Sequence, residues 1–345
     1  MAWSEAAAWE HLQDIAVVEI DERDDEFRIT TRRDVDDLLV SVRRFGLLVP
    51  PLVRRGPAGW VIVSGFRRVE ACRRLGWEKI PARVLEARVT ASTCACLAVS
   101  ENALSRPLNL IEVSRALALM ERLHAGGETR PPDPAAVGLP ANPDHAARMG
   151  RLCRLPEPLQ DGVIEESIPY AIALELGRLE RPAAIAFTRW FRRLKPSLNK
   201  QREILALVLE IAAREGRALD ELMQHPEIET ILNSDEEDGN RKTGQLRGWL
   251  RRRRFPEIVQ AEENFKALRT RLGLSGPVRL APPRDFEGRG FTLSMEFREV
   301  EDIRRLRGIL DDLLSHPERD LLIGGKAERF KADPAPPRPG KRGGT

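Results

Sequence analysis

The residues best suited to chemistry lie where a predicted strand runs directly into a helix, at Ser64 and Gly65. Gly65 lets a ligand approach the backbone, and the free amides and positive dipole end of a helix N-terminus favour an anion. Arg67 and Arg68 stand in the first helical turn, where each charge-assisted hydrogen bond to an anion contributes about 1.5–3 kcal/mol. Two cations there oppose the helix dipole unless an anion is present. The pattern therefore favours a phosphate site over a solvated helix face.

A second candidate is the pair Glu101 and Asn102. A carboxylate beside an amide offers the hard oxygen ligands that Mg²⁺ takes up together with phosphate oxygens. The alternative interpretation is structural: the pair ends one helix, and Asn109 caps the start of the next. Taken alone, this segment favours the structural interpretation.

Composition limits the class of protein. The chain has 345 residues, of which 42% are hydrophobic and 32% charged, as expected for a globular protein of two or three domains. No apolar run approaches the ~20 residues of a membrane span, and the N-terminal segment lacks the basic start of a secretory signal. We therefore expect a cytoplasmic protein with no membrane partner, and we exclude collagens, coiled-coil rods, disulfide miniproteins and integral membrane proteins. Lys and Arg number 56 against 53 Asp and Glu, so the net charge of +3 does not by itself indicate nucleic-acid binding.

The spacing of cysteine and histidine predicts no zinc or iron site. The four cysteines include no CxxC pair, and Cys94 and Cys96 lie in an apolar segment that is typical of a protein core. The five histidines are scattered and do not pair with cysteines or carboxylates in a metal-binding pattern.

The first 125 residues alternate between strand and helix patterns. Asp34 is a candidate N-cap, and Gly46 and Gly76 are natural helix ends. Strands are predicted at residues 13–20, 51–55, 59–64 and 80–86, and helices at 34–45, about 65–75, 90–104 and 109–124.

The rest of the chain reads as a linker, a helical region and a small mixed module. Residues 124–134 are rich in helix breakers, and from there to about 252 the pattern is helical. Two of its helices are predicted at 142–155, with Asn142 as N-cap, and at 198–215. An α-β-β-α module follows, with a helix at 257–272, strands at 277–283 and 291–297, and a helix at 299–314. The basic, proline-rich end is expected to be disordered.

The order and wording of the N-terminal segments resemble the ParB/sulfiredoxin superfamily, on its ParB side. The matching segments are the helix that ends at Gly46 and runs into Pro50-Pro51, the Gly-x-Arg-Arg box at 65–68, Gly-Trp-x-x-Ile-Pro at 76–81, and the run from Glu101 to Arg106 followed by Leu-Asn-x-Ile-Glu at 108–112. More weakly, residues 154–168 resemble the helices after the ParB helix-turn-helix, and 257–314 its C-terminal dimerisation domain. The chain is thus similar to a divergent ParB/RepB-type partition protein.

This resemblance implies an α+β multidomain fold in four parts. Residues 1–125 would be a ParB/sulfiredoxin-like α/β nucleotide-binding domain, and 126–252 an all-α, helix-turn-helix-like DNA-binding domain. Residues 253–325 would be the C-terminal dimerisation module, and 326–345 a disordered basic tail.

The resemblance also implies that the N-terminal domain binds CTP with Mg²⁺, and that the nucleotide drives two domains of a homodimer to engage as a clamp on DNA. The nucleotide-binding positions would be Gly46, Leu47, Ser64, Gly65, Arg67, Arg68, Ile80, Pro81, Glu101 and Asn102, of which Glu101 and Asn102 would also hold the metal. The protein would then associate with the nucleoid. A ParA-type ATPase is a further implied partner, although the Gly/Leu/Arg-rich peptide that typical members use to contact it is missing at the N-terminus.

Phe66 departs from the family pattern, which has Glu between the glycine and the two arginines. A phenyl ring cannot coordinate a metal or accept such a hydrogen bond, so we expect at most a weak CTPase. The sulfiredoxin branch has its reactive cysteine at the same place, so Phe66 also argues against peroxiredoxin repair.

Two basic segments are candidates for DNA contact. The predicted helix 142–155 carries His145 and a stripe of Arg148, Arg151 and Arg154, which suits phosphates or guanine edges. The second is the cluster at 241–254, which ends in Arg251, Arg252, Arg253 and Arg254. The alternative for each is a solvated helix face, and the prolines before the first helix weaken it as a recognition helix.

Three functions stay open on the sequence. The first is a CTP-dependent, ParB-like DNA clamp or partition factor. The second is a nucleotide-gated adaptor that binds protein, and the third is an enzyme on the same fold, such as a slow CTPase.

Overall fold

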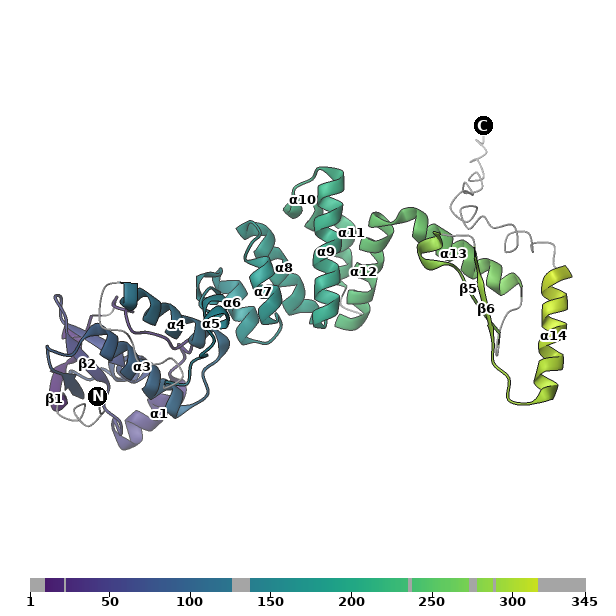
Figure 1. Ribbon diagram of the computed structural model, residues 1–345. Coiled ribbons are helices and arrows are strands. Elements are labelled where there is room, and N and C mark those ends of the chain that lie inside the picture. The colour runs from purple at the N-terminus through teal and green to yellow at the C-terminus, as the bar shows by residue number, and fades with distance from the viewer. Residues whose placement is uncertain are drawn as a thin grey trace. The chain divides into compact units, whose positions relative to one another are not determined.

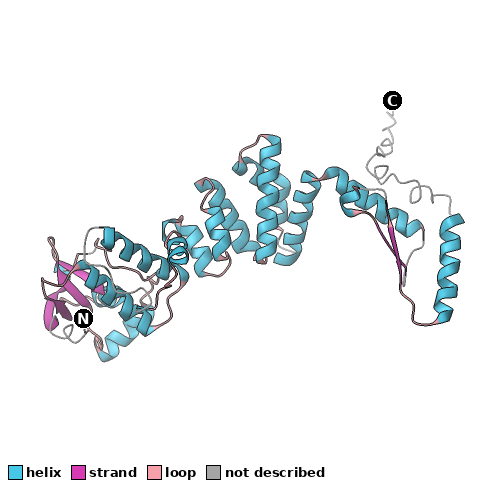
Figure 2. Ribbon diagram, in the orientation of Figure 1, coloured by secondary structure: helices cyan, strands magenta, loops and turns pink. Residues whose placement is uncertain are grey.

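The chain divides into two compact units in a computed structural model (Figure 1), residues 1–201 and residues 202–345. The structure describes residues 10–21, 23–125, 137–234, 238–272, 278–287 and 290–315. Strands are confined to the two ends of the described chain, and helices fill its middle (Figure 2), as the predicted α+β class requires. The four-part division predicted from the sequence stays a prediction.

A four-stranded mixed sheet forms the base of the first unit. Its strands are β1 (Glu10–Ala16), β2 (Leu52–Arg55), β3 (Trp60–Ser64) and β4 (Lys79–Leu85), in the spatial order β1-β4-β2-β3. β4 lies antiparallel to β1 and parallel to β2, and β2 and β3 form an antiparallel hairpin. The hairpin turn closes with a hydrogen bond from the Gly56 amide to the Gly59 carbonyl.

Helices cover both faces of this sheet. β3 is buried along its whole length because its side chains alternate between two cores. Trp60 and Ile62 pack with α1 (Asp36–Phe45) and α2 (Phe66–Arg74). Val61 and Val63 pack in the core that holds α3 (Ala91–Ser105) and α4 (Leu110–Ala125). The sheet thus presents the end of β3 between two pairs of helices.

Most predicted elements of this unit are confirmed within two residues. One exception is the predicted strand 13–20, because the extended strand β1 ends at Ala16 and Val17–Glu19 forms a 3-10 turn. Asp34 lies two residues before α1, where its carboxylate accepts the amide of Asp36.

A helical region continues the first unit. It contains α5 (Pro143–Met149), α6 (Glu157–Ile164), α7 (Tyr170–Leu176) and α8 (Arg181–Leu194). The helix predicted over 142–155 is wrong in its second half. Asn142 caps α5 as expected, but α5 ends at Met149 with Gly150 as C-cap, and Leu152–Arg154 form the 3-10 turn η4. Leu152 of this tighter turn is fully buried, and Pro156 favours the extended conformation of Leu155, so no α-helix resumes before Glu157.

The second unit consists of helices followed by a small mixed module. α9 (Leu198–Glu215) spans the division between the units. The helices that follow are α10 (Leu219–Met223), α11 (Pro226–Asn233), α12 (Gly239–Arg254) and α13 (Pro256–Arg271). The basic cluster is therefore a continuous helix despite its two glycines.

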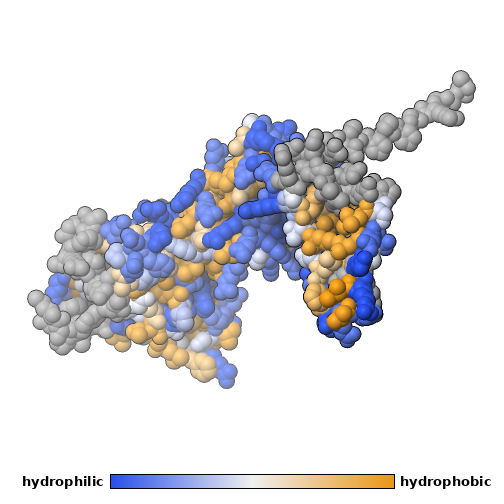
Figure 3. Space-filling view, turned by 45° about the vertical axis from the view of Figure 1, so that its right-hand side comes forward, coloured by the Kyte–Doolittle hydropathy of each residue, from blue (hydrophilic) through white to orange (hydrophobic). Residues whose placement is uncertain are grey.

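The predicted α-β-β-α module is confirmed in its element order. α13 packs on the antiparallel pair β5 (Val278–Ala281) and β6 (Thr292–Met295), and α14 (Val300–Ser315) follows. Its core is small, and hydrophobic side chains gather on one face of the module (Figure 3). Phe297, Val300, Ile303 and Leu314 of this module are exposed.

None of the helices in the described part of the chain is long and apolar enough to cross a lipid bilayer.

Candidate phosphate-binding cavity

Gly65 places the start of α2 at the end of β3. Its φ of 98° and ψ of 22° lie in the left-handed region, and a Cβ built there would stand 2.9 Å from Pro51 Cβ. No side chain caps this helix N-terminus. The amides of Arg68 and Val69 bond to the Gly65 carbonyl, so the amides of Phe66 and Arg67 are the ones that a helix N-terminus offers to an anion. This geometry is consistent with the role predicted for Gly65, which is to let a ligand approach the backbone.

Arg68 connects the start of α2 with two other segments. Its Nη1 donates to the carbonyls of Val49 (2.8 Å) and Pro50 (3.0 Å), and its Nη2 lies 2.5 Å from Glu101 Oε1 on α3. The side chains of Arg68 and Glu101 are 18% and 27% exposed, so the pair is accessible from one side. An anionic ligand could therefore bind Arg68 beside Glu101 or displace Glu101 from it.

Arg67 points toward α1. Its Nε donates to the Asp34 carbonyl and its Nη2 to Asp37 Oδ1, both at 2.6 Å. Partial burial raises the pKa of Asp37, but the hydrogen bond and charge of Arg67 outweigh this and leave the pKa below its usual value. Arg67 is thus held in place at the helix start.

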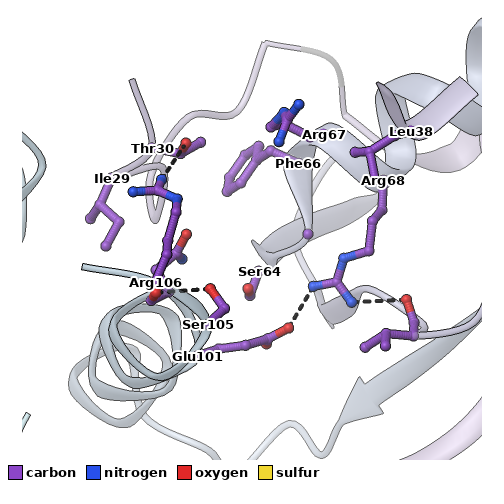
Figure 4. Close-up of a pocket in the computed structure, with 13 residues that line it drawn as sticks. Ile29, Thr30, Leu38, Ser64, Phe66, Arg67, Arg68, Glu101, Ser105 and Arg106 are labelled. Atoms are coloured by element: carbon purple, nitrogen blue, oxygen red, sulfur yellow. Dashed lines mark hydrogen bonds and ion pairs between the residues drawn. The ribbon is translucent and has the colours of Figure 1, made fainter. Parts of the chain in front are cut away.

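A cavity of about 310 Å³ opens at this helix start. Figure 4 shows Arg68 and Glu101 directed toward one another on one side of it, and Thr30 and Arg106 on the other. Its lining residues are Ile29, Thr30, Leu38, Val49, Ser64, Gly65, Phe66, Arg67, Arg68, Glu101, Asn102, Ser105 and Arg106. Three arginines and one carboxylate therefore share one cavity with an uncapped helix N-terminus, which suits a phosphorylated ligand.

Six of the ten predicted nucleotide positions line this cavity, and four do not. The six are Ser64, Gly65, Arg67, Arg68, Glu101 and Asn102. Gly46 ends α1, and Leu47 packs against the sheet core beside it. Ile80 is fully buried on β4, where Pro81 pairs with Asp14 of β1. A nucleotide contact of these four residues stays a prediction.

The predicted magnesium ligands offer a partial coordination set. Asn102 Nδ2 donates to the Ala98 carbonyl of its own helix, so the amide oxygen is the group left for a ligand. Glu101 already shares one oxygen with Arg68. Within the described residues, no three His, Cys, Asp or Glu side chains are grouped so that they could hold a metal. Mg²⁺ would fit here only with ligand phosphates and water completing its shell.

The sequence interpretation missed a buried polar network behind the cavity. Arg106 clamps the fully buried Glu112 with bonds of 2.6 and 2.7 Å, and Glu112 also accepts the amides of Thr31 and Asn109. Burial raises the pKa of Glu112, but these donors outweigh it and lower the pKa to about 2. Asn109 caps α4, as the structural interpretation expected. The spacing Asn109-x-x-Glu112 is that of a capping box, and it is the feature of the sequence that could have indicated the role of Glu112.

Comparison with known proteins agrees with this geometry. The family model of the ParB N-terminal domain matches residues 2–103, which include the strand-to-helix junction at Gly65. The N-terminal part of the chain is thus similar to the ParB N-terminal domain.

Curated relatives match only part of the chain. The nucleoid occlusion protein of Bacillus cereus (strain B4264) is 30% identical over 164 residues, which is 46% of this chain and 54% of the relative. That of Halalkalibacterium halodurans is 31% identical over 134 residues, which is 39% of this chain and 45% of the relative. The chain thus spans about half the length of the curated relatives it matches.

Solved ParB structures are similar at a lower level. The C-terminally truncated chromosome-partitioning protein ParB of Caulobacter crescentus complexed with CTP-gamma-S is 24% identical, with a TM-score of 0.25, and covers 53% of this chain and 99% of that one. The same protein complexed to the centromeric parS site is 20% identical, with a TM-score of 0.32, and covers 55% of this chain and 96% of that one.

The first predicted DNA segment is exposed. Arg148 and His145 lie on α5, and Arg151 and Arg154 lie at η4, all open to solvent. Because α5 ends at Met149, these side chains do not share one α-helical stripe as predicted. Arg154 lies 3.5 Å from Glu121, and both side chains are largely exposed. Their role in DNA binding stays a prediction.

The second predicted DNA segment is largely neutralised by neighbouring acids. Arg251 pairs with Glu262 through two bonds of 2.8 and 2.6 Å. Arg253 pairs equally closely with Glu215, and Arg254 Nε lies 2.7 Å from Glu210. For Arg252 no ion pair is recorded within the described residues. Phosphates could reach three of these four arginines only by replacing a carboxylate.

Proposed function

We propose that this protein is a ParB-type DNA-binding clamp, in which CTP and Mg²⁺ in the cavity drive two N-terminal domains of a homodimer to engage on DNA. The observation that carries the proposal is the cavity at Gly65, where an uncapped helix N-terminus meets Arg67, Arg68 and Arg106. Such a site recognises phosphates by charge and by backbone amides together. The match of residues 2–103 to the ParB N-terminal domain supports CTP as the ligand.

The residues of the cavity have different proposed roles in binding the nucleotide. Gly65 and Ser64 bring the backbone amides to the phosphates, and Arg67 and Arg68 donate charge-assisted hydrogen bonds to them. Glu101 and Asn102 hold Mg²⁺ together with the phosphates, and the metal neutralises the ligand charge. Gly46, Leu47, Ile80 and Pro81 lie near the rest of the nucleotide, as the family resemblance implies. Because Phe66 brings no carboxylate, CTP hydrolysis is weak.

DNA is the proposed macromolecular partner. The exposed cations of a helix-turn-helix-like segment, which are His145, Arg148, Arg151 and Arg154, contact phosphates or base edges, and Arg252 is a further phosphate contact. The curated relatives are named for nucleoid occlusion, which supports a place on the nucleoid, in the cytoplasm. A ParA-type ATPase is a further partner in the same proposal.

A homodimer forms through the C-terminal module. Phe297, Val300, Ile303 and Leu314 expose apolar surface on a module whose own core is small. A second copy that covers this face would bury these side chains in the way that a symmetric dimer requires.

A nucleotide-gated adaptor that binds protein is the second candidate. It is favoured by the short α5 and by the ion pairs that occupy Arg251, Arg253 and Arg254. Both observations reduce the density of free positive charge that DNA needs.

Calorimetry with CTP, ATP, GTP and UTP in the presence of Mg²⁺ tests the nucleotide site. We expect selective binding of CTP that is lost in Arg67→Ala and kept in Arg44→Ala, a matched exposed arginine outside the cavity. Absence of binding to every nucleotide would overturn the proposal. A DNA titration at several salt concentrations then separates the two candidates, because only DNA contacts give a steep salt dependence.

A further inference from the structure

Thr30 is the point where the cavity wall meets α4. It lines the cavity and is buried, and its hydroxyl lies 3.4 Å from both Arg106 Nη2 and Glu112 Oε1. The Thr30 carbonyl accepts a hydrogen bond of 3.0 Å from Arg115 Nη1 on α4. A ligand that moves Thr30 therefore acts directly on one contact of Arg115, and a ligand that recruits Arg106 acts on that contact through Thr30.

Arg115 also reaches in the opposite direction, toward the exposed segment at η4. Its Nη2 donates to Gln160 Oε1 of α6 at 3.4 Å, which is near the long limit for a hydrogen bond. Gln160 Nε2 in turn donates to the carbonyls of Cys153 (3.1 Å) and Leu155 (2.8 Å). These two carbonyls belong to the turn that presents Arg151 and Arg154.

A second bond fixes the same turn to α4. The Cys153 amide donates to the hydroxyl of Ser114, which is fully buried and precedes Arg115 in the chain. The amide of Cys153 is therefore bonded to Ser114 of α4. Its carbonyl is linked to Arg115 of α4 through the side chain of Gln160. The position of the η4 backbone depends on that of α4.

The placement of Arg115 is costly for a purely structural residue. Burial lowers the pKa of Arg115, and so do the charges of Arg33 and Arg28, while Cys153 and Glu112 offset part of this effect. A guanidinium that is partly desolvated beside other cations lowers the stability of the fold unless its hydrogen bonds compensate.

We infer that Arg115 is a positioning residue that couples occupancy of the cavity to DNA binding at η4, because one end of its guanidinium holds the cavity wall and the other end holds the turn that carries Arg151 and Arg154. The inference rests on the proposed function. Coupling of this kind is reciprocal: if the nucleotide changes the DNA affinity by some factor, DNA changes the nucleotide affinity by the same factor. Factors of roughly 5 to 150 are usual.

The test is a thermodynamic cycle on the full chain. The dissociation constant of a labelled DNA duplex is measured by fluorescence anisotropy with and without saturating CTP and Mg²⁺, at one fixed salt concentration. The ratio of the two constants is the coupling factor. We expect Arg115→Met and Gln160→Leu each to bring this factor close to one, while each variant binds CTP alone and DNA alone within about threefold of wild type, under 1 kcal/mol.

Arg122→Met is the matched control. Arg122 also lies on α4 and also donates to a backbone carbonyl, that of Glu26 at 3.1 Å, but it has no recorded bond to Gln160. We expect it to keep the wild-type coupling factor. If Arg115→Met fails to fold, Gln160→Leu still breaks the connection.

The outcomes separate the inference from the proposed function. A wild-type coupling factor of one overturns the inference even when both ligands bind. So does an unchanged factor in Arg115→Met or Gln160→Leu, or an equal loss in Arg122→Met. A purely structural role of Arg115 would weaken the binding of CTP alone and of DNA alone but leave the coupling factor unchanged. That result would also overturn the inference. Failure of the wild type to bind CTP or DNA at all would instead overturn the proposed function.

Discussion

Arg68 of α2 and Glu101 of α3 form a charged contact of 2.5 Å at the mouth of the cavity. The contact satisfies Arg68 while no anion is bound, and it places a carboxylate where phosphates are proposed to lie. A triphosphate must therefore compete with Glu101 for Arg68, unless a metal ion lies between the phosphates and the carboxylate. Under the proposed function, this contact predicts that tight binding of the triphosphate requires Mg²⁺.

Glu101→Gln is expected to change nucleotide affinity in opposite directions with and without the metal. Without Mg²⁺ the substitution removes the competitor for Arg68 and tightens CTP binding by about tenfold, the equivalent of 1.4 kcal/mol. With Mg²⁺ it removes a metal ligand and weakens binding. Calorimetry with EDTA or with Mg²⁺ measures both values. Glu86→Gln, on an exposed carboxylate paired with Arg88, is the control. A change of the same sign in both conditions would refute a metal role for Glu101.

Glu112→Gln is expected to destabilise the first unit by about 3 kcal/mol, because Arg106 loses the partner of a buried ion pair. The folded-state pKa of about 2 lies below the ordinary value of 4.5, so the carboxylate stabilises the fold above pH 4.5. This contribution is lost as the pH falls from 4.5 toward 2. The wild type should therefore lose about 3 kcal/mol over that range, and Glu112→Gln should not. Urea unfolding over a pH series measures the difference, and parallel curves for the two proteins would contradict the assignment.

The sequence predicted the local elements of the first unit because their signals are local. Gly46 was expected to end a helix and does so with a φ of 76°. The junction at Gly65 was predicted from a strand pattern that runs into a helix pattern. Asn109 was predicted as a cap and accepts two amides of α4.

Contacts between distant segments were not predictable in the same way. Thr30 and Thr31 meet Glu112 across about eighty residues of chain, and no periodicity in either segment indicates the pairing. The basic run at the end of α12 was interpreted from its density of charge alone. Its carboxylate partners, such as Glu215, come from other helices, and only the packing of those helices reveals that the charge is compensated. The end of α5 was misplaced because Gly150 was given no weight against the arginine spacing.

Phe66→Glu is expected to make nucleotide binding depend more steeply on Mg²⁺. Phe66 lines the cavity at the first position of α2, so a carboxylate there stands beside the phosphates and offers an additional metal ligand. Without Mg²⁺ its charge repels the phosphates, and affinity falls below that of the wild type. Calorimetry at several Mg²⁺ concentrations measures the slope, and release of inorganic phosphate over hours reports any gain in hydrolysis. Phe66→Gln has the same shape without the charge and should keep the wild-type slope.

The double variant Arg148→Gln with Arg151→Gln is expected to reduce the salt dependence of DNA binding. Each phosphate contact that is lost lowers the slope of log K against log salt by about 0.9, so two contacts lower it by about 1.8. Arg253→Gln is the matched control, because Arg253 is bonded to Glu215 through two hydrogen bonds and faces α9 rather than a free surface. Anisotropy titrations of one labelled duplex at several salt concentrations give the slopes. An unchanged slope in the double variant, with a reduced slope in the control, would move the DNA interface from the η4 segment to α12.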